Sequence, residues 1–149
     1  MESGTVVAFD FGAKRIGVAV GDLTRSIAHP LQAIDFEDNA RRMDTIAALV
    51  AEWKPVRLIV GIPVSDGPQA HPLAARIHRF ARRLRSRFGL PVEMVDEHLS
   101  SWAASRKLSH SGVRARDQKR RIDAMAACAI LETWFEDRYP GSTLCIDER

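Results

Sequence analysis

Residues 5–21 read TVVAFDFGAKRIGVAVG, and this stretch decides the fold. Thr5–Phe11 is a continuous apolar run of strand length, and Arg15–Gly21 is a second run of the same kind. Only three residues, beginning with Gly12, separate the two runs, so we expect a tight turn between antiparallel strands. The chain therefore begins with a hairpin.

The pattern after this hairpin changes to an alternation of helices and strands. A weaker third strand is expected over Ile27–Ile34, where Pro30 indicates a sheet edge or a bulge. Further strands are expected over residues 57–61 and 92–96, and helices over 39–53, 72–88, about two turns from Ser100 or Ser101, and 119–139. This order predicts an α/β fold, with a mixed five-stranded sheet of three antiparallel and then parallel strands, flanked by helices.

Length and composition are those of one globular domain. The 149 residues are 46% hydrophobic and 28% charged, and no apolar stretch approaches the roughly 20 residues of a membrane helix. We expect a single domain over residues 1–140 and a C-terminal tail over 141–149 that can be disordered. The N-terminus lacks the features of a secretory signal, and Cys128 and Cys145 are expected to be reduced thiols in a cytoplasmic protein.

The charge is distributed unevenly along the chain. Residues 76–121 hold thirteen lysines and arginines against four acids, whereas residues 132–149 hold five acids against two arginines. A basic half predicts attraction to a polyanion such as nucleic acid, although a solvated cationic surface has the same composition.

Three acidic positions interrupt or close apolar segments: Asp10, the pair Asp96-Glu97, and Asp123. Aspartate and glutamate are rarely buried unless they are paired or bound to a cation. The first two positions close expected strands, where sites form in helix-covered sheets, and Asp123 lies on the inner side of the last helix. We expect three carboxylates to converge on Mg²⁺ or Mn²⁺, which prefer oxygen ligands.

The pattern leaves two questions open at this site. Strand alternation sends Asp96 and Glu97 to opposite faces of the sheet, so periodicity does not say which of them enters the site. Each acid taken alone is also typical of a turn or a helix cap.

Four ordered motifs resemble the YqgF/RuvX family, whose members are candidate Holliday junction resolvases that are also described as nucleases of the 5′ end of pre-16S rRNA. The resemblance covers about residues 4–139, and its motifs are AFDFGAKRIGVAV at 8–20, IVGIP at 59–63 with Asp66-Gly67, DEHLS at 96–100 and KRRIDAMAA at 119–127. It implies a ribonuclease-H-like fold and a divalent-metal nuclease site. The resemblance also selects the acids, because the family's catalytic and metal-binding positions correspond to Asp10, Glu97 and Asp123.

The chain departs from the family pattern at three places. His98 stands where arginine is usual, Ser101 stands where threonine is usual, and the loop over Pro63–Gly67 is one residue shorter. Without the arginine, the site lacks a bidentate phosphate donor; His98 could replace it as a donor, or could be a partly buried hydrogen-bonding residue.

Basic residues in three segments are candidates for contacts to a nucleic-acid backbone. Arg76, Arg79 and Arg83 recur at helical spacing on one face of a predicted helix. The other candidates lie after the first strand or before Asp123: Lys14, Arg15, Arg114, Arg116, Lys119, Arg120 and Arg121. Cations at a helix N-terminus oppose its dipole, so those before Asp123 indicate a bound phosphate backbone. The alternative for each segment is a solvated turn or helix face.

The function expected from these features is a metal-dependent endonuclease, a hydrolase of structured nucleic acid that processes the 5′ end of pre-16S rRNA in ribosome biogenesis. Alternatives are a Holliday-junction resolvase-like DNase, which would work as a homodimer, and a non-catalytic nucleic-acid-binding module. A third alternative is an actin-like ATPase or kinase, because residues 10–17 resemble that superfamily's phosphate hairpin. Those enzymes clamp ATP between two domains, and this chain is long enough for one.

Overall fold

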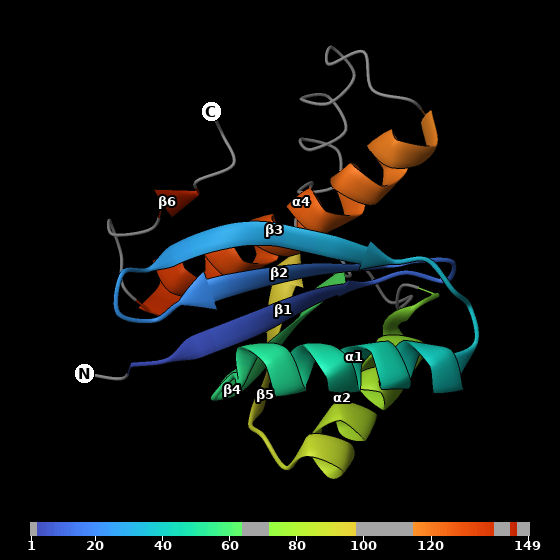
Figure 1. The fold of residues 1–149 in the computed structure, drawn as a ribbon, viewed down its shortest axis with the longest axis horizontal. Coiled ribbons are helices and arrows are strands. Elements are labelled where there is room, and N and C mark those ends of the chain that lie inside the picture. The colour runs from blue at the N-terminus through green and yellow to red at the C-terminus, as the bar shows by residue number, and fades with distance from the viewer. Residues whose placement is uncertain (1–2, 64–71, 98–114, 139–143, 146–149) are drawn as a thin grey trace.

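A mixed β-sheet forms the centre of the molecule, and helices cover both of its faces (Figure 1). The computed structural model describes residues 3–63, 72–97, 115–138 and 144–145. In chain order the elements are β1 (Thr5–Phe11), β2 (Ile16–Asp22), β3 (Ile27–Ile34), α1 (Asn39–Trp53), β4 (Arg57–Pro63), α2 (Ala74–Phe88), β5 (Val92–Glu97), α4 (Ala115–Arg138) and β6 (Leu144–Cys145). None of the helices in these ranges has both the length and the hydropathy of a membrane span.

The sheet has the strand order β5-β4-β1-β2-β3-β6. Strands β1, β2 and β3 form an antiparallel meander, and β4 and β5 are parallel to β1. The predicted five-stranded mixed sheet is therefore confirmed. The two-residue strand β6, which pairs with β3 at Ile27 and Ala28, was not expected from the sequence.

A bulge interrupts the ladder between β2 and β3. Val18 lies opposite Gln32, whereas the next residue, Ala19, lies opposite Pro30. Leu31 is therefore the extra residue of a β-bulge, beside a proline that has no N–H to donate. The sequence-based prediction of an irregularity at Pro30 is confirmed.

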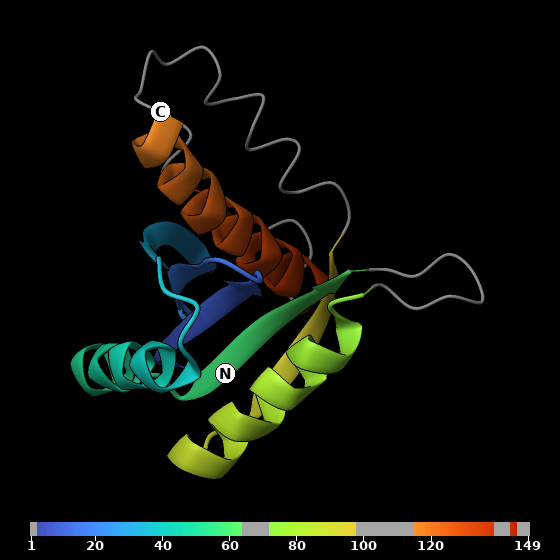
Figure 2. The ribbon, with the colours of Figure 1, turned by 90° about the vertical axis from the view of Figure 1, so that its right-hand side faces the viewer.

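Side chains alternate between two separate apolar clusters along β1. Val7 and Phe9 join the cluster under α1 and α2, and Val6 and Ala8 join the cluster under α4. Figure 2 shows α4 on one side of the sheet and α1 and α2 on the opposite side. The odd-numbered side chains of β1 thus face α1 and α2, and the even-numbered ones face α4.

The helix ends differ in detail from the predictions. Asp38, and not Asn39, caps α1, because its carboxylate accepts a hydrogen bond from the backbone N–H of Ala40. The helix α2 begins at Ala74, two residues after the expected start, and ends as predicted at Gly89 with a positive φ of 65°.

The start of α4 is also corrected. The last helix was predicted to begin at residue 119, but it begins at Ala115. Lys119, Arg120 and Arg121 therefore lie beyond the first turn, where the helix dipole has little effect. Their position at a helix N-terminus is not an argument for a bound phosphate.

Candidate active site

Asp10 lies under α4 near the carboxyl end of β1. It is paired across the hairpin with Gly17 of β2, and residues directly opposite each other project to the same face of a sheet. That face carries α4, because Val6 and Ala8, at alternate positions of β1, pack in the α4 cluster. Asp10 is half-buried there.

Gly17 allows α4 to lie directly on the sheet at this point. A Cβ atom at position 17 would lie 1.8 Å from the backbone oxygen of Asp123 and 3.1 Å from its Cα atom. No side chain fits in that space. The close approach brings Asp123 to the residue that pairs with Asp10, so the first strand and the last helix meet at two predicted carboxylates.

The carboxylate of Asp123 is held by Arg15. The side chain of Asp123 is 19% exposed, and its Oδ2 accepts a hydrogen bond of 2.5 Å from Arg15 Nε. Burial raises the pKa of Asp123 above its ordinary value, and the hydrogen bond and charge of Arg15 only partly oppose this. Asp35 adds a small upward effect on the same pKa. A cation at this carboxylate is therefore favourable, and in this structure Arg15 supplies it.

The backbone of residue 97 lies at the end of β5, at the same edge of the sheet. Parallel strands β1, β4 and β5 end at one edge of the sheet, and Pro63 of β4 pairs with Glu97 of β5. Along β5, position 97 has the same parity as Val95, which packs in the α4 cluster, whereas Asp96 has the opposite parity. The register therefore distinguishes the two acids that periodicity left open; the side chain of Glu97 lies outside the described residues.

Hard divalent cations suit the donors at this edge. Asp10 and Asp123 offer carboxylate oxygens, the ligands that Mg²⁺ and Mn²⁺ prefer. Among the side chains that the structure describes, no group of three or more His, Cys, Asp or Glu is arranged to hold a metal ion. Two of the three predicted ligands are thus brought together, and the third belongs to a strand that ends at the same edge.

The predicted basic residues have several different environments. Lys14, Lys119 and Arg121 are exposed, and Arg120 forms an ion pair of 3.2 Å with Asp35. Arg76, Arg79 and Arg83 are exposed along α2. Several predicted features lie outside the described residues: Arg114, the side chain of Arg116, His98, Ser101, the loop after Pro63 and the helix expected from Ser100.

Sequence reasoning missed one buried arginine. Arg42 of α1 is 2% exposed, and its side chain donates to backbone oxygens of Phe36, Gly12 and Ala13. It thereby fixes the β1–β2 turn that follows Asp10. The signal was available, because Arg42 lies four residues before Ile46 on the apolar side of the helix, where a charge needs an explanation.

Known structures share this fold. A Thermus thermophilus RuvC in complex with a Holliday junction substrate matches 95% of the chain with a TM-score of 0.52 and 13% identity, and 99% of that chain is covered. The Fowlpox virus resolvase, also solved with Holliday junction DNA, matches 91% of the chain with a TM-score of 0.58 and 12% identity, again with 99% of that chain covered. At these identities the likeness shows the ribonuclease-H-like fold.

Relatives of known name are much closer in sequence. A protein of Methylobacillus flagellatus is 49% identical over 89% of this chain and 91% of its own length, and one of Chromobacterium violaceum is 48% identical over 93% of this chain and all of its own length. Both are named as candidate pre-16S rRNA nucleases. The RuvX family, described as Holliday junction resolvase, matches residues 4–137. Because this family matches nearly the whole chain and the two relatives are almost half identical to it, the chain belongs to the RuvX family of nucleases, and so to the hydrolases.

Proposed function

We propose that this protein is a divalent-metal-dependent endonuclease that processes the 5′ end of pre-16S rRNA in the cytoplasm. The observation that carries the proposal is the approach of α4 to the hairpin at Gly17, which brings Asp123 to the strand position opposite Asp10. The names of the two close relatives support RNA as the substrate. The junction DNA of the structural neighbours provides the competing substrate for the test.

The proposed ligands are Asp10, Glu97 and Asp123, with Mg²⁺ or Mn²⁺ as the cofactor. A bound divalent ion would supply an activated water and would neutralise charge at the scissile phosphate. Asp10 and Asp123 would hold their carboxylates on the α4 face, where half-burial limits competition from solvent. Arg15 would give up its hydrogen bond to Asp123 when a stronger cation or a phosphate arrives.

Basic residues around this edge would position the strand. We assign this role to the predicted set, of which Lys14 and Arg15 follow Asp10 in the hairpin turn. Phosphate contacts of this kind orient a strand without reading its sequence. The substrate would therefore be recognised by its structure and its charge.

A cleavage assay that compares the wild type with the Asp10→Asn variant tests the proposal. The purified protein with Mn²⁺ should cut a pre-16S rRNA fragment near its 5′ end, and Asp10→Asn should reduce the rate by at least about 100-fold because a metal ligand is lost. Asp44→Asn, on the exposed side of α1, is the matched control and should cut at the wild-type rate. Equal cutting by Asp10→Asn would disprove the mechanism, and cutting of four-way DNA junctions alone would reassign the substrate.

A further inference from the structure

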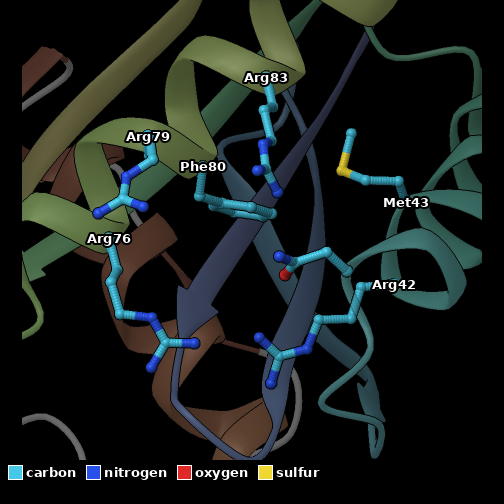
Figure 3. Close-up of a pocket in the computed structure, with 7 residues that line it drawn as sticks. Arg42, Met43, Arg76, Arg79, Phe80 and Arg83 are labelled. Carbon is cyan, nitrogen blue, oxygen red and sulfur yellow. The ribbon is translucent and has the colours of Figure 1, made fainter.

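A small pocket between α1 and α2 is lined by four arginines (Figure 3). It lies on the face of the sheet opposite Asp10 and Asp123, and its volume is about 50 Å³. Its lining consists of Asn39, Arg42, Met43, Arg76, Arg79, Phe80 and Arg83. This space has room for a small polar group, and the pocket is open to solvent.

Arg42 forms the floor of this pocket and has one unused donor. Its Nε donates to the Phe36 oxygen, and its Nη2 lies 3.0 Å from the oxygens of both Gly12 and Ala13. Its Nη1 is buried and has no hydrogen-bond partner within the described part of the chain. Because this donor is shielded from solvent, it adds to the cost of burying the Arg42 charge when no anion lies nearby.

Positive charge in the pocket is poorly compensated. Arg42 and Arg76 both lie against the Phe11 ring, at 5.3 and 5.4 Å from its centroid, and Figure 3 shows the two side chains extending towards each other. Burial and the neighbouring Arg76 lower the pKa of Arg42, and Glu37 opposes this only in part. Among the described residues, no carboxylate forms an ion pair with Arg76, Arg79 or Arg83.

An oxyanion satisfies each of these features. Its oxygens accept hydrogen bonds from several guanidinium groups at once, and its charge removes the repulsion between them. A protein carboxylate would also carry negative charge, but it has two oxygens where a phosphate group offers more. The lining, with one buried arginine and three exposed ones, suits a group at the surface of a larger ligand.

We propose that the pocket binds one backbone phosphate of the nucleic-acid strand on which the active site acts. This rests on the proposed nuclease function. Phe11 connects the two places, because it contacts Arg42 and Arg76 on one face while its neighbour Asp10 faces α4 on the other. The phosphate is therefore distant from the one that is cut, and the strand passes over the edge of the sheet between them.

Binding of oligoribonucleotides in EDTA tests the pocket without cleavage. Arg76→Gln combined with Arg83→Gln removes two rim charges, and Arg25→Gln combined with Arg82→Gln removes two exposed charges that do not line the pocket. The pocket variant should bind about ten- to hundredfold more weakly than the control, and its salt slope should fall by about 0.7. Thermal unfolding should show that both variants remain folded.

Oligonucleotides with one neutral methylphosphonate linkage identify the bound phosphate. At one linkage, neutralisation should weaken binding to the wild type about tenfold and should leave binding to the pocket variant unchanged. If no linkage shows this dependence, the proposal is overturned, and titration with inorganic phosphate then tells whether the pocket takes a free anion. Dependence at one linkage in a protein that never cuts would support the pocket and reject the nuclease. If the wild type cuts but the pocket variant binds as tightly as the control variant, the nuclease is supported and the pocket is rejected.

Discussion

Asp123 has surroundings that affect its protonation in opposite directions. Burial disfavours the carboxylate, and Arg15 favours it through a hydrogen bond and its charge. The net effect is a raised pKa, so the effect of burial is the larger one. A divalent cation would add to the favourable side, because its charge stabilises the carboxylate.

The pH dependence of folding should reveal this raised pKa. Because the folded-state pKa of Asp123 exceeds its ordinary value of 3.8, the protonated acid favours the folded state, and this contribution is lost as pH rises through the folded-state pKa. Asp123→Asn does not titrate. In metal-free urea unfolding, the stability of the wild type relative to this variant should therefore fall as pH rises from below 3.8 through the folded-state pKa.

Arg15→Gln is the informative control for this measurement. It removes the group that lowers the pKa of Asp123. The fall in stability with rising pH, measured against the same protein carrying Asp123→Asn, should therefore become larger and should extend to higher pH. A wild type that gains stability over Asp123→Asn as pH rises would show that ion pairing outweighs burial, and the account of this residue would be wrong.

At the scale of elements, the decisive contact is that of α4 with β2. Gly17 and Gly21 both lie under this helix, but they face different atoms. A Cβ atom at position 17 would overlap the Asp123 backbone, whereas one at position 21 would come within 2.8 Å of the end of the Leu131 side chain. Backbone of a packed helix cannot move alone, but a side-chain end can.

Gly17→Ala should therefore destabilise the protein by about 3 kcal/mol, towards the upper end of overpacking effects. Gly21→Ala should cost about 1 kcal/mol, because Leu131 and Phe135 can shift slightly. Urea unfolding of both variants measures the difference. Equal losses would mean that α4 is not held tightly against the hairpin at Asp123.

Sequence reasoning predicted the elements better than their ends. Apolar runs and turn residues identified β1 to β5, α1 and α2, because each buries one continuous face. The start of α4 was missed because its first turn is polar, although alanine, arginine and glutamine favour helix. β6 was missed because two residues have no periodicity, and their strand partner lies more than a hundred residues away.

The residues of the candidate site also divide into those that the sequence reveals and those that need the structure. Asp10 and Asp123 could be found because charges stood in apolar segments, and Arg42 could have been found by the same rule. The choice of Glu97 over Asp96 needed the sheet register, or a resemblance, because alternation alone gives two equal faces. The arginine pocket needed the packing of α1 beside α2, since its members are far apart in sequence.

At the scale of the whole molecule, the sheet separates the arginine pocket from Asp10 and Asp123, which have Arg15 on their own side. The carboxylates lie on the α4 face, and the arginine pocket lies between the helices of the other face. This separation keeps Arg42 and Arg76 from neutralising Asp10 and Asp123. In the proposed scheme, the cation and the backbone phosphate would be bound at the same time on opposite faces of the sheet.

Metal binding should stabilise the whole domain. If Mn²⁺ binds only the folded state, a concentration of about 100 times its Kd adds about 2.7 kcal/mol, which raises Tm by several degrees. Asp10→Asn and Asp123→Asn should abolish this rise, and the exposed Asp44→Asn should retain it. Thermal unfolding at a series of Mn²⁺ concentrations, with Ca²⁺-free buffer, measures it. An undiminished rise in both variants would place the metal elsewhere.

The bulge at Leu31 also has a consequence for self-association. Of the described strands, β3 is covered at Ile27 and Ala28 by β6, and its remaining outer rim carries a proline and an irregular residue. This rim has no regular row of backbone donors and acceptors with which a strand of a second copy could pair. Pairing of two copies of this nuclease along β3 is therefore disfavoured, and so are extended polymers built along this margin.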